Sequence, residues 1–140
     1  MLYLGADHAG YSTKEVIRRF LDKNNIQYKD FSSKYVKEDD YPDYAKQVAK
    51  AVAKDKNAKG VLICGTGTGM AMAANRVKGV RAAFVYDIYS AIKAREDNDA
   101  NIITLRGKYF SKLSAKALVK IFLDTPFSKL PRHKRRIKKL

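Results

Sequence analysis

The chain of 140 residues is poor in the side chains that build disulfide or metal frameworks, with one cysteine, two histidines and no tryptophan. The lone Cys64 cannot form a disulfide within the chain, which is typical of proteins from a reducing compartment, so we expect the cytoplasm. One cysteine with His8 and His133 matches no usual zinc-ligand spacing, so no zinc site is expected.

Long apolar runs are also missing. No segment is long enough to span a bilayer, and residues 1–7 lack the basic start and apolar stretch of a signal peptide. The length is that of one domain, which we expect over residues 1–140.

Acidic residues are few: 14 Asp and Glu stand against 29 Lys and Arg, for a net charge of +15. Such an excess favours nucleic acid, a membrane surface or anionic metabolites as partners. Much of it lies in residues 129–140, where the plain alternative is a solvated basic face. The other basic residues lack the interleaved aromatics of a single-strand binder. A basic nucleic-acid-binding module remains the main non-enzyme alternative.

The apolar pattern predicts strands that alternate with helices along the whole chain, which indicates an α/β fold with a parallel sheet covered on both faces. Strands are expected over residues 1–6, 26–31, 61–64, 80–86 and 101–105. Helices are expected over residues 12–24, from 41 to about 52, from 71, and over 87–96 and 111–123.

Local signals refine two of these helices. Ser12, with Glu15 three residues later, is the expected cap of the first helix, and Asp87 is the expected cap of the helix over 87–96. The last predicted helix should bury one apolar face, formed by Leu113, Ala117, Leu118, Ile121 and Phe122.

The stretch Val61–Met70 passes from a buried strand into three glycines on alternate positions, Gly65, Gly67 and Gly69, and then into a helix. Glycine allows positive φ and close approach of a ligand, and a helix start offers unpaired N–H groups. Such a turn suits a phosphate, or an oxyanion that develops during a reaction. Cys64 stands at its mouth.

Dinucleotide binding is one alternative for this turn. Gly65 and Gly67 give the first half of G-x-G-x-x-G, and Asp87 follows about 20 residues later at the end of the next strand. However, Met70 occupies the place of the third glycine, and the motif follows the third strand instead of the first. A Walker A loop is excluded because no G-K-[ST] follows.

Candidate polar residues gather where strands are predicted to end. Asp7-His8, Cys64 and Asp87 all follow strands, and ligands of parallel sheets bind beyond the carboxyl ends of the strands. A cysteine protease or acyl-transfer enzyme would pair Cys64 with His8 or His133, but the phosphate-like surroundings favour other chemistry.

Six motifs are spread in order over nearly the whole chain: Gly5-Ala6-Asp7-His8-Ala9-Gly10, Asp40-Tyr41-Pro42-Asp43-Tyr44-Ala45, Ile63-Cys64-Gly65-Thr66-Gly67-Thr68-Gly69, Ala73-Ala74-Asn75-Arg76, Asn98-Asp99-Ala100-Asn101 and Arg132-His133-Lys134-Arg135-Arg136. Together they resemble the B-type ribose-5-phosphate isomerases, a family that includes galactose-6-phosphate isomerase subunits. The resemblance implies a Rossmann-like three-layer sandwich with a five-stranded parallel sheet. It also implies a homodimer or dimer of dimers with sites at the subunit interface, a sugar phosphate as substrate, and no metal, nucleotide or specific nucleic acid.

The implied reaction is aldose–ketose isomerisation. A proton is removed from the carbon beside a carbonyl, an enediolate forms, and a proton returns to the neighbouring carbon, which requires a base and an oxyanion stabiliser. Cys64 matches the family's base, and Thr66 matches the hydroxyl that assists proton transfer. The backbone N–H groups that match the enediolate cradle belong to Gly65, Gly67, Thr68 and Gly69.

Further residues match substrate contacts. Asp7 and His8 match residues that hold sugar hydroxyls and phosphate, and Tyr41 matches a wall near the base. On sequence alone, His8 could equally be a loop histidine, and Tyr41 could simply pack at a helix start.

The phosphate contacts match basic residues near the end of the chain. Arg132 and Arg136 stand four apart, so they share one face of a helix and could grip one phosphate. The tail 129–140 would thus contribute to the phosphate site. Lys108 aligns with a position that is usually arginine, where lysine keeps the charge but loses the fork. Arg106, nearby, has no assigned role.

The sequence departs from the family at Asp97. Most ribose-type members carry a histidine immediately before the asparagine matched by Asn98, where it opens the furanose ring. Galactose-type subunits can also lack this histidine, so the substrate is less defined than the reaction. Ribose 5-phosphate to ribulose 5-phosphate is the favoured reaction and a six-carbon aldose phosphate the alternative. We expect slower ring opening, or ring opening by Asp97.

Overall fold

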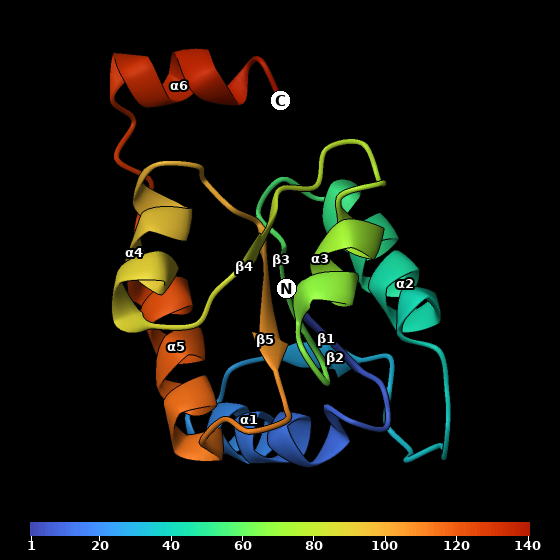
Figure 1. Cartoon of the computed structure of the whole chain (residues 1–140). Coiled ribbons are helices and arrows are strands. Elements are labelled where there is room, and N and C mark those ends of the chain that lie inside the picture. Colours follow the sequence, from blue (N-terminus) through green and yellow to red (C-terminus); the bar gives the residue numbers. More distant parts are fainter.

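A computed structural model describes residues 1–140 and contains one parallel sheet of five strands (Figure 1). The strands are β1 (Leu2–Ala6), β2 (Tyr28–Asp30), β3 (Lys59–Cys64), β4 (Ala82–Phe84) and β5 (Ile102–Arg106), in the spatial order β2-β1-β3-β5-β4. The predicted α/β class with a five-stranded parallel sheet is confirmed.

Helices cover both faces of the sheet. They are α1 (Tyr11–Lys23), α2 (Tyr41–Ala53), α3 (Thr68–Ala74), α4 (Ile88–Glu96), α5 (Lys112–Asp124) and α6 (Pro131–Ile137). Helices α1, α4 and α5 bury their apolar residues against one face, and α2 and α3 against the other (Figure 1). None of the helices combines the length and the apolar content needed to cross a bilayer.

The central strand β3 divides the core between these faces. Successive side chains of a strand point to opposite sides of a sheet, so Val61 and Ile63 pack with α1, α4 and α5, whereas Leu62 and Cys64 pack with α2 and α3. Because β3 lies between β1 and β5, its residues from Gly60 to Cys64 are all buried. Such burial on both faces explains its continuous apolar run.

The strand register aligns the ends of β1, β3 and β5. Ala6 pairs with Ile63, and Cys64 pairs with Arg106 at the edge where these strands end, which we call the carboxyl edge. Gly60 pairs with Ile102 at the opposite, amino edge. The loops that follow β1, β3 and β5 therefore meet at one edge.

The expected cap of the first helix is wrong. Helix α1 begins at Tyr11 after Gly10, and no side chain caps it. The turn is closed earlier, because Oδ1 of Asp7 accepts hydrogen bonds from the amides of Ala9 (3.0 Å) and Gly10 (3.1 Å). Gly10 must lack a side chain, since a Cβ there would lie 2.3 Å from the carbonyl oxygen of Ile63.

The expected buried face of the last long helix is partly wrong. Leu113 is 67% exposed and Ala117 is also exposed, whereas Leu118 and Phe122 are buried as expected. The buried face of α5 consists of Ala115, Leu118, Val119 and Phe122, which keep helical spacing on a stripe rotated from the predicted one.

The edge strands are shorter than predicted, while the predicted cap of α4 is confirmed. Strands β2 and β4 have three residues each and lie at the two sides of the sheet, where pairing exists on one side only. Asp87 caps α4, because its carboxylate accepts a hydrogen bond from the amide of Ser90 at 2.7 Å. In turn, the hydroxyl oxygen of Ser90 accepts a hydrogen bond from the amide of Asp87.

Candidate active site

The glycine turn after β3 is held in a conformation that other residues would disrupt. Gly67 has φ of +79° and precedes α3, and a Cβ there would lie 2.8 Å from the ring of Phe84. A Cβ on Gly69 would lie 2.6 Å from the ring of Tyr41, whose exposed side chain would have to shift. The requirement for glycine is therefore strict at Gly67.

The sulfur of Cys64 faces this turn. Cys64 is 4% exposed, and its Sγ accepts a hydrogen bond from the amide of Gly67 at 3.1 Å. The turn therefore directs a backbone N–H group at the sulfur.

A cavity of about 360 Å³ opens over Cys64 at the carboxyl edge. It brings together most of the predicted site residues, which come from the ends of β1, β3 and β5 and from the start of α2. Its lining consists of Asp7, His8, Ala9, Tyr41, Cys64, Gly65, Thr66, Thr68, Gly69, Met72 and Lys108.

Two hydroxyl groups lie together on the turn. The Oγ1 atoms of Thr66 and Thr68 are 2.8 Å apart, which is a hydrogen bond in either direction. The amide of Lys108 donates to the carbonyl oxygen of Gly65 at 3.1 Å, so the loop after β5 is fixed to the turn after β3. This contact keeps Lys108 among the residues that line the cavity.

Arg106 acquires a role from the same loop. Its guanidinium group donates hydrogen bonds to the carbonyl oxygens of Lys108 (3.0 Å) and Tyr109. Because Tyr109 has a positive φ of 54°, this loop has a sharp bend, and Arg106 supports it.

Asp7 and His8 have different surroundings at the end of β1. Asp7 is 6% exposed, and burial raises the pKa of its carboxyl group although the amides of Gly10 and Ala9 oppose the shift. His8 Nδ1 lies 3.0 Å from Oδ1 of Asp39, and this hydrogen bond raises the pKa of the His8 ring.

Asp39 is a residue that the sequence analysis did not select. It stands 31 positions after His8, within the run Glu38-Asp39-Asp40, and no local pattern distinguishes it from its two neighbours. Asp7, His8 and Asp39 also form the one group of side chains spaced for a metal ion, with ligand atoms within 4.8 Å of one another. Hydrogen bonds already engage Asp39 and Nδ1 of His8.

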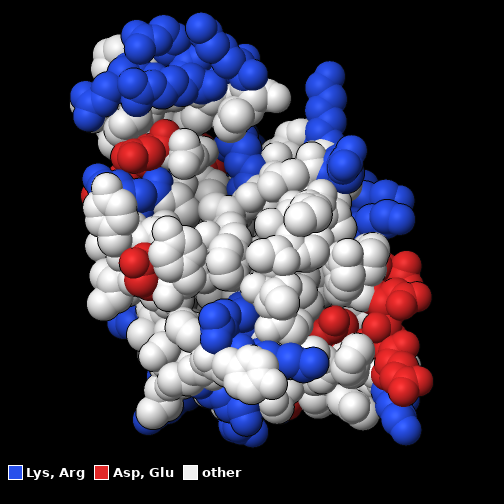
Figure 2. All heavy atoms as spheres, viewed as in Figure 1, with Lys and Arg blue, Asp and Glu red and all other residues white.

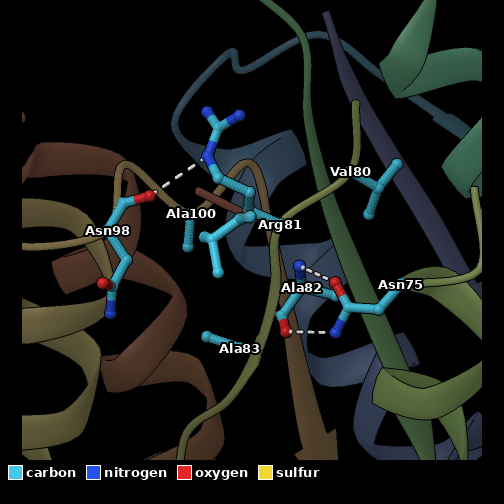
Figure 3. A pocket seen from close by; sticks show the side chains of 8 residues that line it. Asn75, Val80, Arg81, Ala82, Ala83, Asn98 and Ala100 are labelled. Atoms are coloured by element: carbon cyan, nitrogen blue, oxygen red, sulfur yellow. Dashed lines mark hydrogen bonds between the residues drawn. The ribbon is translucent and has the colours of Figure 1, made fainter. Parts of the chain in front are cut away.

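The remaining predicted residues lie elsewhere. A second pocket, of about 410 Å³, opens beside β4 and contains Asn98 (Figure 3). Arg81 donates to the backbone oxygens of Asn98 (3.1 Å) and Asp99, while the Asn98 side chain has no hydrogen-bond partner within the chain. The side chain of Asn75 bonds both the amide and the carbonyl oxygen of Ala82, each at 2.8 Å (Figure 3).

Helix α6 and the segment before it contact the end of α4, next to Asn98. The amide of Ser128 donates to the carbonyl oxygen of Glu96, and Nε2 of the buried His133 lies 3.5 Å from Oδ1 of Asp97. Arg132 and Arg136 are both exposed on α6 and have no acidic partner. Lysine and arginine side chains cover this helix (Figure 2).

The predicted site residues therefore form two groups at opposite edges of the sheet. Asn98 precedes β5, which begins at Ile102 on the amino edge and ends at Arg106 beside Cys64. The five residues of β5 rise about 3.3 Å each, so roughly 13 Å of strand separates the two edges. A single chain thus keeps Asp97, Asn98, Arg132 and Arg136 away from Cys64.

Asp87 joins neither group. Its carboxylate caps α4, and it lines neither of the two pockets. The acidic residue that a dinucleotide fingerprint needs for the ribose is therefore engaged in helix capping, which disfavours that alternative.

Comparisons with known proteins agree with this geometry. A family model described as Ribose/Galactose Isomerase matches residues 2–140. The ribose-5-P isomerase B of Listeria innocua is 40% identical over 125 residues, which are 89% of this chain and 84% of that protein. A D-erythrulose-4-phosphate isomerase of Pectobacterium atrosepticum is 38% identical over 125 residues, 89% of this chain and 82% of that protein.

A solved structure has the same fold. The ribose-5-phosphate isomerase B of Mycoplasma genitalium, crystallised with bound ribulose 5-phosphate, superimposes with a TM-score of 0.94. It is 37% identical, and the match covers 99% of this chain and 91% of that chain.

Proposed function

This chain belongs to the ribose/galactose isomerase family, and from that premise we propose that it interconverts ribose 5-phosphate and ribulose 5-phosphate. One observation carries the proposal: the Cys64 sulfur, bonded by the Gly67 amide, lies in a cavity that also contains Asp7 and His8. A base, oxyanion donors and hydrogen-bonding groups for a sugar are thus available in one place.

Cys64 acts as the base in the proposed mechanism. Its thiolate removes the proton from C2 of the open-chain aldose, and the electron pair of that bond moves onto the C1 carbonyl to give an enediolate. The thiol then returns a proton to C1, O2 loses its proton, and the ketose forms. Thr66, hydrogen-bonded to Thr68, moves the proton between O1 and O2.

The backbone of the turn stabilises the enediolate. Gly65, Thr68 and Gly69 line the cavity and Gly67 lies between them, and in this proposal their amides face the enediolate, because a fixed amide dipole stabilises charge without reorganisation. Tyr41 lies against Gly69 and forms one wall. Asp7 and His8 hold the oxygens of the sugar phosphate, and Lys108 adds positive charge.

The active unit in this proposal is a homodimer, or a dimer of dimers built from it. The second copy supplies Asn98, Arg132 and Arg136 to the cavity over Cys64. Support comes from the two arginines, which are exposed and have no acidic partner, and from the strand length that separates them from Cys64 in one chain. Two exposed guanidinium groups four apart suit a phosphate dianion.

The identity of the sugar is less well defined than the type of reaction. A relative named for a four-carbon substrate is nearly as similar as those named for ribose 5-phosphate. Asp97 replaces the expected ring-opening histidine, so a six-carbon or an open-chain aldose phosphate is the alternative substrate. The single cysteine, left free, fits a cytoplasmic location.

The test is the formation of ribulose 5-phosphate from ribose 5-phosphate by wild type and by Cys64→Ala. We expect turnover in the wild type and a loss of several orders of magnitude in the variant. Equal activity of the two proteins would show that Cys64 is not the base. If the wild type is inactive, four-carbon and six-carbon aldose phosphates are assayed, and inactivity on all of them would overturn the isomerase proposal.

A further inference from the structure

We propose that Asp39 is a positioning residue of this site: it orients the His8 ring through Nδ1 and supports the imidazolium form, so that the other ring nitrogen, Nε2, donates a hydrogen bond to an anionic oxygen of the substrate. This inference rests on the proposed function for the identity of the substrate, and on the geometry of Asp39 and His8 for everything else.

The contact between Asp39 and His8 restrains both the backbone and the ring. Oδ1 of Asp39 accepts hydrogen bonds from the His8 amide (2.7 Å) and from Nδ1 of the ring (3.0 Å). The same oxygen therefore binds the backbone and the ring of His8, and rotation of the ring would break its hydrogen bond to Asp39.

This contact also requires a proton on Nδ1, so Nε2 becomes a donor when the ring carries a second proton. An ionised carboxylate only accepts hydrogen bonds, so Nδ1 of His8 must be protonated. Nε2 of His8 has no partner within the chain, and His8 lines the cavity over Cys64. Nε2 is therefore the ring atom that remains for the substrate.

Tyr44 fixes Asp39 from the other side. The Tyr44 hydroxyl, on the first turn of α2, donates to Oδ2 of Asp39 at 2.7 Å. The Asp39 side chain is only 10% exposed, so both of its oxygens are engaged in a sheltered position. The start of α2 thereby anchors a histidine that belongs to the end of β1.

The charges around His8 favour the imidazolium, which is the form in which Nε2 is a donor. The hydrogen bond to Asp39 raises the pKa of His8 and the Asp7 carboxylate adds to it, while burial opposes the shift. Burial would raise the pKa of Asp39, but hydrogen bonds from the His8 amide, the Tyr44 hydroxyl and the His8 ring lower it. Burial and the bond to Asp39 raise the pKa of Tyr44 to about 12, so it stays a donor.

Other charged groups face the same cavity. Lys108 lines it from the loop after β5, and in the proposed dimer the second copy's Arg132 and Arg136 would approach it as well. These cations oppose protonation of His8. The carboxylate of Asp39, in direct contact with the ring, offsets them.

The experiment is an NMR pH titration of the His8 ring in wild type and in Asp39→Asn. The chain has only two histidines, so His133 serves as an internal reference. In the wild type, His8 should titrate above the ordinary value of about 6.5. In Asp39→Asn its titration should move to lower pH while that of His133 stays in place.

Two further variants separate the contact from the loss of charge. Asp43→Asn removes a carboxylate that is exposed on the first turn of α2 and does not touch His8, so the titration should be unchanged. Tyr44→Phe keeps the Asp39 charge and removes a donor that competes for the carboxylate, so His8 should still titrate above the ordinary value. If Asp39→Asn fails to fold, the wild-type titration still tests the inference, because a value at or below the ordinary one overturns it.

A second measurement tests the role of Nε2 toward the substrate. Inorganic phosphate is titrated into wild type and Asp39→Asn at pH 7.5, and the perturbation of the His8 ring signals is followed. We expect binding about tenfold weaker in the variant, in line with the loss of one charge-assisted hydrogen bond. In the isomerase assay, the KM for ribose 5-phosphate should increase as the pH is raised, and this increase should begin at a lower pH in Asp39→Asn than in the wild type. The kcat should change less than KM.

The outcomes are distinct. A His8 titration at or below the ordinary value in the wild type, or one that Asp39→Asn leaves in place, would overturn the inference, as would an equal effect of Asp43→Asn. Because the titrations need no turnover, an inactive wild type would defeat the proposed reaction and leave the test of Asp39 intact.

Discussion

The amide of Gly67 donates a hydrogen bond to the sulfur of Cys64 at 3.1 Å, and Gly67 itself adopts a φ of +79°. The residue that contacts the sulfur is thus in a conformation that favours glycine. A substitution at Gly67 therefore tests the environment of the proposed base.

Gly67→Ala should lower both stability and activity. The added Cβ would be 2.8 Å from Phe84 and would adopt a positive φ, so we expect a loss of about 2–4 kcal/mol of unfolding free energy and a strong loss of turnover. Urea unfolding and the isomerase assay measure the two effects. Gly79→Ala is the matched control, since Gly79 has φ of +88° with nothing within 4 Å of the added Cβ. It should cost about 1 kcal/mol and leave activity intact; equal effects of both variants would refute the role of the Gly67 contact.

Arg136→Ala should weaken substrate binding while Arg135→Ala should not. Both arginines are exposed on α6, but Arg136 is one of the pair assigned to the phosphate. We expect kcat/KM to fall by about 10- to 100-fold in Arg136→Ala, the range for one charge-assisted hydrogen bond, and to stay within about twofold in Arg135→Ala. Steady-state kinetics at fixed ionic strength checks this, and equal losses would indicate a general effect of charge.

A hybrid of two inactive variants should regain activity. Cys64→Ala and Arg132→Ala/Arg136→Ala subunits, co-expressed with different tags and purified through both, form a dimer in which one of two shared sites is intact. We expect about half the wild-type activity per dimer. Inactive hybrids would contradict the sharing of sites between copies.

Asp97→His should speed the turnover of ribose 5-phosphate. The Asp97 carboxylate lies 3.5 Å from Nε2 of His133 and 3.9 Å from Nζ of Lys93, and histidine is the more usual general acid at neutral pH. If ring opening limits the wild type, we expect an increase of about an order of magnitude. Asp97→Asn should be no faster than the wild type. An Asp97→His variant without a gain would remove ring opening from the limiting steps.

Asp7→Asn should stabilise the fold at neutral pH while it lowers activity. Burial raises the pKa of Asp7, so the folded state disfavours the ionised form, and stability is lost as the pH rises through that raised pKa. The variant removes this effect, and we expect a gain of about 1 kcal/mol at pH 7. The gain should vanish below the ordinary Asp pKa of about 3.9, where the carboxyl group is protonated in both states. Urea unfolding at pH 7 and pH 3.5 distinguishes this from a gain that persists in acid.

Local signals in the sequence predicted much of the fold. The alternation of apolar runs with helical patterns was sufficient for the α/β class, and Asp87 after a predicted strand was sufficient for the cap of α4. The strand order could not be predicted in this way, because β5 lies between β3 and β4 through pairings between distant segments. The same limit hid Lys14, a fully buried lysine that bonds the carbonyl oxygen of Ser32 at 2.7 Å and pairs with Asp30.

The candidate site shows the same division. Residues within one loop, such as Cys64 and Gly67, could be selected from their spacing. Asp39 could not, since its contact with His8 spans 31 positions. The position of Asn98 at the opposite edge from Cys64 was implicit in the predicted parallel sheet, because Asn98 precedes the strand over 101–105 whereas Cys64 ends the strand over 61–64; the register of β3 and β5 confirms it.

The bonds from Asn75 to Ala82 bear on how copies of this chain can meet. Strand β4 lies at the side of the sheet, and an unpaired strand there invites the addition of another chain's backbone. Asn75 imitates one residue of such a chain, since its amide group engages both the N–H and the C=O of Ala82. Another strand could pair with Ala82 only if both hydrogen bonds between Asn75 and Ala82 were broken. The backbone groups of Ala82 are thus already paired within the chain, so we expect contacts between copies to use side-chain surfaces instead of added strands.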